Sequence, residues 1–88
     1  MMQTVVIDCA GVQSADEFWQ RYLTAVQPEG AAIFGRNLDA FWDAVEVGGP
    51  GQPNAKLVFK NTSGLEANFL QALRRIAIDA TQTEIELP

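Results

Sequence analysis

Histidine is absent from these 88 residues, and cysteine occurs once, at Cys9. Without histidine, catalysis by a Ser-His-Asp triad or a Cys-His pair is excluded, and zinc binding is disfavoured. A single cysteine excludes an internal disulfide, and because Cys9 ends an apolar run we expect a buried thiol. Lysine occurs only at positions 56 and 60. We therefore expect a protein that is not an enzyme, with no catalytic residue, no cofactor and no metal.

Long apolar runs are missing as well. No stretch approaches the roughly 20 apolar residues that a membrane-spanning helix needs. The first residues, MMQTVVIDCAG, place no basic segment before their short apolar run, unlike a signal peptide. We therefore expect a cytoplasmic protein with no membrane association.

Basic residues are few: six Lys and Arg stand against eleven Asp and Glu, which gives a net charge of −5. Nucleic acid is disfavoured as a partner because its recognition needs a basic surface. The charge favours a basic protein as partner, although acidity also serves solubility alone.

The composition, 48% hydrophobic and 19% charged, is typical of a globular chain, and its length predicts a single domain over residues 1–88. Hydrophobic patterning predicts the following elements. The strands are 3–8, 55–60 and 83–87, and the helices are 15–27, 37–47 and one that starts at a cap on Thr62 or Ser63 and ends near Ala80. Trp19 and Tyr22 share a helical face with apolar residues, so we expect core packing rather than a binding surface.

The order β-α-α-β-α-β predicts an α/β fold with a three-stranded parallel sheet covered by helices, because strands separated by helices pair in parallel through right-handed crossovers. The strand 3–8 contains the run Val5-Val6-Ile7. This continuous apolar run is typical of a strand buried on both faces, so we place it in the middle of the sheet.

The segment FGRNLDAFWDAV, residues 34–45, predicts a glycine turn, a cap at Asn37 and a short helix. At about 3.6 residues per turn, Asp39, Asp43 and Glu46 share a face beside the apolar stripe, with Trp42 at the boundary. The helix dipole favours a negative charge at Asp39 but disfavours one at Glu46, which lies near the C-terminal end. Asp43 also repels Asp39, since like charges four residues apart cost roughly 0.2–0.5 kcal/mol. This small cost suggests a function, although a solvated face explains the pattern equally well.

The same segment resembles the signature of the barstar family, intracellular inhibitors of bacterial ribonucleases. The matching residues are Gly35, Asn37, Leu38, Asp39, Ala40, Trp42 and Asp43. The order of elements is also similar over essentially the whole chain. The resemblance implies a barstar-like fold and a protein that blocks a nuclease active site.

The inhibition that the resemblance implies is mimicry of the RNA phosphate by carboxylates from the 33–46 loop and helix. Asp43 corresponds to the carboxylate that enters the phosphate-binding site, and Asp39 to a second interfacial acid. With Glu46 added, the predicted partner-binding residues are Ile33, Phe34, Gly35, Asn37, Leu38, Asp39, Trp42, Asp43 and Glu46. The implied partner is a basic protein, an extracellular-type ribonuclease or a toxin nuclease domain, and the free inhibitor is expected to be a monomer.

Four positions depart from the family pattern. Ile33 replaces an aromatic residue, Arg36 and Arg75 replace acids, and Glu46 replaces a neutral residue. These changes favour a redirected specificity, because mismatched charges reject some partners. They also leave two alternatives open: a non-inhibitory interaction or regulatory domain, and an immunity protein for a toxin that is not a ribonuclease. A metal site on the acidic face is a third, weaker hypothesis, since such sites usually draw ligands from several elements.

Overall fold

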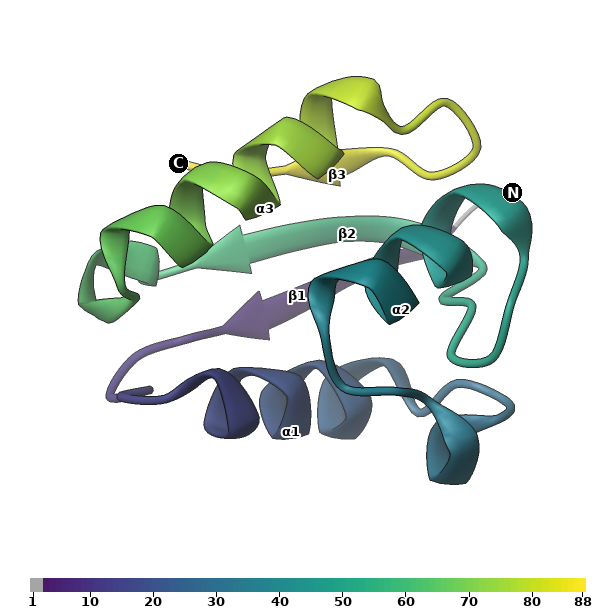
Figure 1. The fold of residues 1–88 in the computed structure, drawn as a ribbon, viewed down its shortest axis with the longest axis horizontal. Coiled ribbons are helices and arrows are strands. Elements are labelled where there is room, and N and C mark those ends of the chain that lie inside the picture. The colour runs from purple at the N-terminus through teal and green to yellow at the C-terminus, as the bar shows by residue number, and fades with distance from the viewer. Residues whose placement is uncertain (1–2) are drawn as a thin grey trace.

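A computed structural model describes residues 3–88 (Figure 1). Its strands are β1 (Gln3–Asp8), β2 (Ala55–Lys60) and β3 (Ile85–Glu86). Its α-helices are α1 (Ala15–Val26), α2 (Leu38–Trp42) and α3 (Ala67–Asp79). Shorter helical turns are η1 (Ala31–Ile33), η2 (Asp43–Val47) and η3 (Thr62–Gly64). None of the helices in residues 3–88 is long and apolar enough to cross a membrane.

The three strands form one parallel sheet, which confirms the predicted fold class. The strand order is β1-β2-β3, so the prediction that β1 lies in the middle is wrong. Both crossovers advance the sheet in the same direction, which leaves the first strand at an edge whatever its composition. The register pairs Gln3 with Ala55 at one end of β1 and Asp8 with Lys60 at the other.

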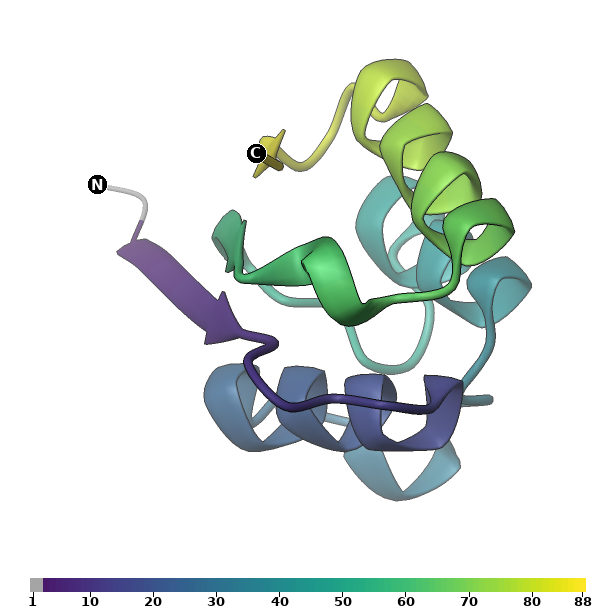
Figure 2. The same ribbon diagram turned by 90° about the vertical axis from the view of Figure 1, so that its left-hand side faces the viewer.

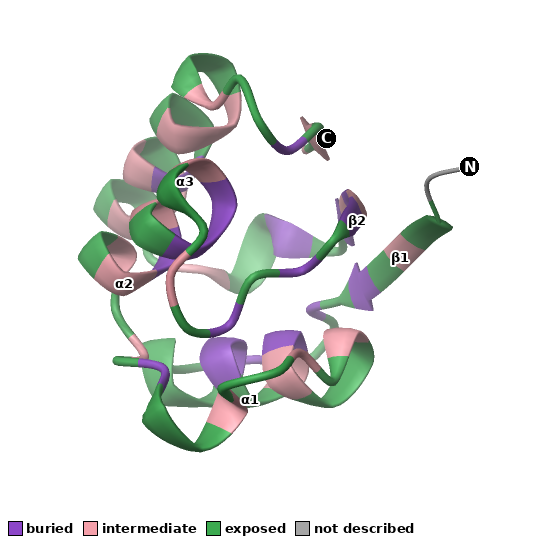
Figure 3. Ribbon diagram, turned by 90° about the vertical axis from the view of Figure 1, so that its right-hand side faces the viewer, coloured by how far each residue is buried: buried purple, intermediate pink, exposed green. Residues whose placement is uncertain are grey.

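The helices lie on one face of the sheet, as the two side views show (Figures 2 and 3). Side chains of β2 alternate accordingly: Ala55, Leu57 and Phe59 are buried, whereas Lys56 and Val58 are only half-buried. In β1, Ile7 is buried but Val6 is 47% exposed. The expectation that β1 is buried on both faces is therefore wrong, because its even-numbered residues face away from the helices.

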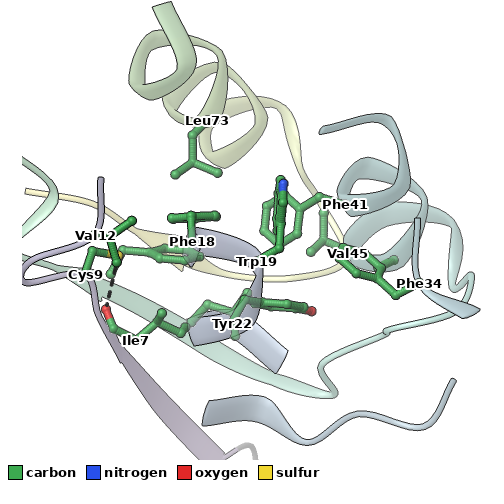
Figure 4. Close-up of a cluster of buried hydrophobic side chains, with 13 residues drawn as sticks. Ile7, Cys9, Val12, Phe18, Trp19, Tyr22, Phe34, Phe41, Val45 and Leu73 are labelled. Atoms are coloured by element: carbon green, nitrogen blue, oxygen red, sulfur yellow. Dashed lines mark hydrogen bonds between the residues drawn. The ribbon is translucent and has the colours of Figure 1, made fainter. Parts of the chain in front are cut away.

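The core fills the space between the sheet and the helices and is largely aromatic (Figure 4). Trp19 and Tyr22 are fully buried, which confirms their predicted place, and the Trp19 ring lies 5.5 Å from the ring of Phe41 on α2. The Tyr22 hydroxyl donates a 2.7 Å hydrogen bond to the carbonyl oxygen of Gly51, and burial raises the pKa of this tyrosine. Cys9 is buried as predicted, and desolvation raises its pKa to about 11.

The helix and strand ends follow local hydrogen bonding more closely than hydrophobic pattern. Helix α1 is capped by Ser14, whose Oγ accepts a 3.1 Å hydrogen bond from the Glu17 N–H. The predicted cap of α3 is wrong: Thr62–Gly64 form the separate turn η3, and Glu66 caps α3 by accepting from Phe69 N at 2.9 Å. The last strand is shorter than the predicted 83–87, and the Thr83 hydroxyl instead binds the carbonyl of Val45.

Candidate functional site

The loop before α2 is fixed by a glycine and an asparagine. A Cβ on Gly35 would lie 3.0 Å from the Cβ of Ala40, so glycine allows the loop to pack closely on the helix. Asn37 Oδ1 accepts a 2.7 Å hydrogen bond from Ala40 N, and Asn37 Nδ2 donates to the Gly35 carbonyl at 3.2 Å. Both polar ends of the Asn37 side chain therefore hold the start of the helix, as the sequence predicts for a cap.

The inner face of α2 and η2 is anchored in the core. Phe41, Ala44 and Val45 are buried, and Leu38 and Ala40 are half-buried against the same cluster. A helix as short as α2, five residues, is not stable in water by itself. Its position is set by this packing, which leaves the opposite face free for another molecule.

The second half of the segment is a π-turn rather than a continuation of the α-helix. The carbonyl oxygen of Asp43 accepts hydrogen bonds from Gly48 N at 2.8 Å and Gly49 N at 2.9 Å. Gly48 has a φ of 91°, a left-handed conformation that suits glycine. Because a π-turn contains more residues than an α-turn, the angular spacing used to predict the acidic face does not extend beyond Asp43.

Asp39 and Asp43 lie on the exposed side of this segment. Within residues 3–88 neither carboxylate forms an ion pair or a hydrogen bond. Asp39 is in the first turn of α2, where the helix dipole favours a negative charge. The two acids thus lie on a fixed segment and have no bonded partner in the described part of the chain.

Glu46, the third predicted acid, is used within the molecule. Its carboxylate accepts hydrogen bonds from Thr81 N at 2.7 Å, Thr81 Oγ1 at 2.6 Å and Gln82 N at 2.9 Å. The Thr81 hydroxyl, followed by the two N–H groups, lowers the pKa of Glu46 below its usual value. The predicted face of three acids is therefore wrong in this respect, since the π-turn directs Glu46 towards residues 81–82.

Phe34 is the second predicted contact that the structure places elsewhere. Its ring is 5% exposed and lies 5.6 Å from the ring of Trp19 and 5.7 Å from that of Tyr22 (Figure 4). Gly51 packs so closely on it that a Cβ there would approach Phe34 Cδ1 to 2.6 Å. Phe34 is thus a core residue, whereas its neighbour Ile33 is 73% exposed.

An apolar residue missing from the prediction also lies on this segment. Val47 ends η2 and is 71% exposed, whereas Trp42 is half-buried at the boundary, as predicted. The helical spacing gives no signal for Val47, because this residue lies in the π-turn beyond Asp43. Val47 and Ile33 are both among the large apolar side chains that are exposed to solvent in residues 3–88.

The two arginines that depart from the family pattern have acidic neighbours. The Arg36 guanidinium pairs with the Asp16 carboxylate at 3.0 Å and donates to the Asp16 carbonyl at 3.0 Å, so it is held against α1. Arg75 pairs with Asp79 one turn along α3, at 3.4 Å. The positive charge of Arg36 is therefore compensated locally.

The described part of the chain contains no cluster of three or more His, Cys, Asp and Glu residues arranged to hold a metal ion. Asp39 and Asp43 come from one short segment, and Glu46 is turned to the loop at residues 81–82. Residues 33–47 therefore offer two exposed carboxylates, Asp39 and Asp43, on a stretch of chain that also carries the exposed Ile33 and Val47.

These features define a small α/β domain that displays an acidic helix from a three-stranded parallel sheet. The family model described as Barstar (barnase inhibitor) matches residues 2–86, and the chain belongs to this family. The match confirms the resemblance drawn from the 33–46 segment. No curated protein matches the sequence.

Proposed function

We propose that this protein is an intracellular inhibitor of a bacterial ribonuclease and that Asp39 and Asp43 replace the RNA phosphate in the nuclease active site. The observation on which the proposal rests is the state of these two acids. They are exposed and unpaired within residues 3–88, on a segment whose inner face is fixed in the core. Membership of a family described as barnase inhibitors supports the same function.

The chemistry follows from what a ribonuclease must bind. Its active site holds a phosphodiester with cationic side chains, and a carboxylate supplies the same negative charge without a bond that can be cleaved. Charge-assisted hydrogen bonds of this kind are short and strong. Because α2 and η2 are held by the core and by Asn37, little conformational freedom remains to be lost on binding.

The surroundings of the two acids fit a protein partner. Ile33 and Val47, on the same 33–47 stretch as the acids, are 73% and 71% exposed, and Trp42 on this stretch is half-buried. Apolar and aromatic groups around a charged pair exclude water when a partner docks, which strengthens the electrostatic attraction. The net charge of −5 attracts a basic protein at long range. We further propose a cytoplasmic protein that is monomeric when free.

An immunity protein for a toxin that is not a ribonuclease is the second candidate. It is favoured by Ile33, an aliphatic residue where the family has an aromatic one, and by Arg75, whose side chain is 81% exposed. Both residues alter the contact chemistry while the acid pair stays in place. A regulatory interaction domain would share these features but would inhibit no nuclease.

A titration of the purified protein against barnase and a panel of other bacterial ribonucleases tests the proposal. RNA cleavage should stop at a one-to-one ratio for at least one enzyme. The double variant Asp39→Ala/Asp43→Ala should weaken inhibition at least a hundredfold, because leaving a buried cation unpaired costs about 3–5 kcal/mol. The control Glu17→Ala/Glu86→Ala removes the same charge from α1 and β3 and should inhibit like the wild type.

The outcomes separate the candidates. Equal inhibition by the wild type and the double aspartate variant would exclude phosphate mimicry by these residues. Protection against a toxin nuclease that cleaves DNA, with no effect on any ribonuclease, would favour the second candidate. Inhibition of no nuclease at all would favour the regulatory domain.

A further inference from the structure

Residues 81–83 dock against η2 through four hydrogen bonds. Three of them converge on the carboxylate of Glu46, from Thr81 N, Thr81 Oγ1 and Gln82 N, at 2.6–2.9 Å. The fourth runs from the buried Thr83 hydroxyl to the carbonyl oxygen of Val45, at 2.6 Å. The loop before β3 is therefore hydrogen-bonded to Val45 and Glu46 in η2, the turn that begins with Asp43.

We infer that Glu46 is a positioning residue, which holds the π-turn and with it Asp43 in the binding geometry, rather than a contact to the partner. This inference rests on the proposed function, because it assigns Glu46 a role in the same surface. Glu46 then affects binding because it holds the turn against residues 81–83, and not because it pairs with a cation of the nuclease.

The first argument is the occupancy of the carboxylate. Two backbone N–H groups and one hydroxyl satisfy both oxygens of Glu46: Oε1 accepts from the N–H groups of Thr81 and Gln82, and Oε2 from the Thr81 hydroxyl. Hydrogen bonds to an ionised acceptor are about twice as strong as neutral ones. A partner cation would have to compete with these bonds, whereas Asp39 and Asp43 have no such bonds to break.

The second argument is the need for an anchor at this end of the segment. Asn37 and Phe41 fix the start of α2, but η2 is followed by Gly48 and Gly49, which have no side chains to pack. Two consecutive glycines leave the backbone free to move unless other contacts hold it. The contacts of Glu46 and Val45 with residues 81–83 supply this second anchor, and Asp43 lies between the two.

Amide hydrogen exchange in the free protein tests the positioning without any partner. In Glu46→Ala the amides of Gly48 and Gly49, which bond to the Asp43 carbonyl, should exchange about tenfold faster or more, because the local opening is easier. Glu46→Gln keeps one oxygen acceptor and should fall between Glu46→Ala and the wild type. The matched control Glu86→Gln removes the same charge from the outer sheet face and should leave these amides unchanged.

Kinetics with barnase, or with whichever ribonuclease of the panel the wild type inhibits, gives the second readout. Glu46→Gln should speed dissociation and leave the salt dependence of association unchanged. The double variant Glu46→Gln/Thr81→Val should lower the free energy barrier to dissociation by less than the sum of the effects of the two single variants, because both changes break the same group of hydrogen bonds. Asp43→Ala should leave the exchange of Gly48 and Gly49 close to that of the wild type.

Unchanged exchange at Gly48 and Gly49 in Glu46→Ala would overturn the inference, whatever the ribonuclease assay shows. So would a slower and less salt-sensitive association of Glu46→Gln with additive effects of Thr81→Val, since loss of a direct charge contact to the partner predicts that pattern. Failure of the proposed function looks different: the wild type then inhibits no ribonuclease, while the exchange measurement still decides whether Glu46 positions the turn.

Discussion

Helix α1 and the α2–η2 segment begin alike but use their acids differently. Both have a side-chain cap, Ser14 in one and Asn37 in the other, and both carry acids in the first turn. On α1, Asp16 pairs with Arg36. On α2, Asp39 has no partner within residues 3–88, and neither does Asp43 at the start of η2. Glu17 on α1 likewise has no ion pair within residues 3–88, but the α2–η2 segment carries two such acids four residues apart.

Glu46 extends the comparison within the α2–η2 segment. It lies three residues after Asp43 and carries the same charge, but its carboxylate is bonded to Thr81 and Gln82. Sequence spacing alone assigned both acids to one face. Charge count is thus a poor guide to a binding surface, and the hydrogen-bonding state of each acid is a better one.

The largest expected effect separates the two faces of the α2–η2 segment. Phe41→Ala should lower the free energy of unfolding by about 3–5 kcal/mol, because it empties a fully buried site in the aromatic core. Asp43→Ala should change stability by less than about 0.5 kcal/mol, since its side chain is exposed and unbonded. Urea denaturation of both variants measures the difference. If both variants lower the free energy of unfolding by similar amounts, Asp43 stabilises the fold, and its exposed carboxylate is not a group that only a partner contacts.

Removing the two helix caps should sharpen the comparison between α1 and α2. Ser14→Ala and Asn37→Ala should each cost about 1 kcal/mol of stability, the usual value for a lost cap. Only Asn37→Ala should also weaken ribonuclease inhibition, because it loosens the segment that displays the acids. Thermal unfolding and the inhibition assay on the same samples check this. Equal weakening by Ser14→Ala would show that inhibition follows global stability alone.

A smaller effect is expected from the ion pair that joins the two regions. Asp16→Ala should lower stability by less than about 1 kcal/mol, because the Asp16 side chain is 83% exposed. It also leaves the Arg36 charge uncompensated near the acid pair. At low salt the variant should then associate with a basic ribonuclease more slowly than the wild type, and at high salt the two association rates should become equal. Stopped-flow association at two ionic strengths measures this, and a salt-independent change would contradict it.

The smallest effect concerns acid pH. The pKa of Glu46 is lowered by its bonds to Thr81 and Gln82, and that of Asp8 by Asn61 and then the Ala10 N–H. A lowered folded-state pKa adds stability above the ordinary values of 4.5 and 3.8, and this is lost as the pH falls through the lowered pKa. The stability gap between the wild type and Glu46→Gln should therefore close on acidification. A gap that stays constant below pH 4.5 would contradict this.

Much of the fold could be predicted from local patterns. The bounds of β1 and β2 follow from runs of apolar residues, and the starts of α1 and α2 follow from Ser14 and Asn37. Strand order could not be predicted from apolar content, because the direction of the crossovers decides it. The start of α3 was missed because Glu66, rather than Thr62 or Ser63, provides the cap.

The candidate site was predictable where each residue acts through local spacing and unpredictable where a distant segment intervenes. The exposure of Asp39, Asp43 and Ile33 agrees with the sequence pattern. Glu46 was misplaced because its partners are 35 and 36 residues away and because the π-turn changes the helical spacing. Phe34 was misplaced because its contacts with Trp19 and Tyr22 depend on how α1 packs.

The pairing of β1 with β2 has a consequence for the order in which the protein folds. The two strands meet from Gln3 and Ala55 to Asp8 and Lys60, so the chain between them, including α1, α2 and η2, is a loop that the sheet closes. Closing a long loop slows folding, because chain entropy is lost before distant contacts form. Residues 81–83 are synthesised after β1, β2 and α3. Under the inference for Glu46, the turn that carries Asp43 therefore reaches its final geometry only after the chain is made through Thr83.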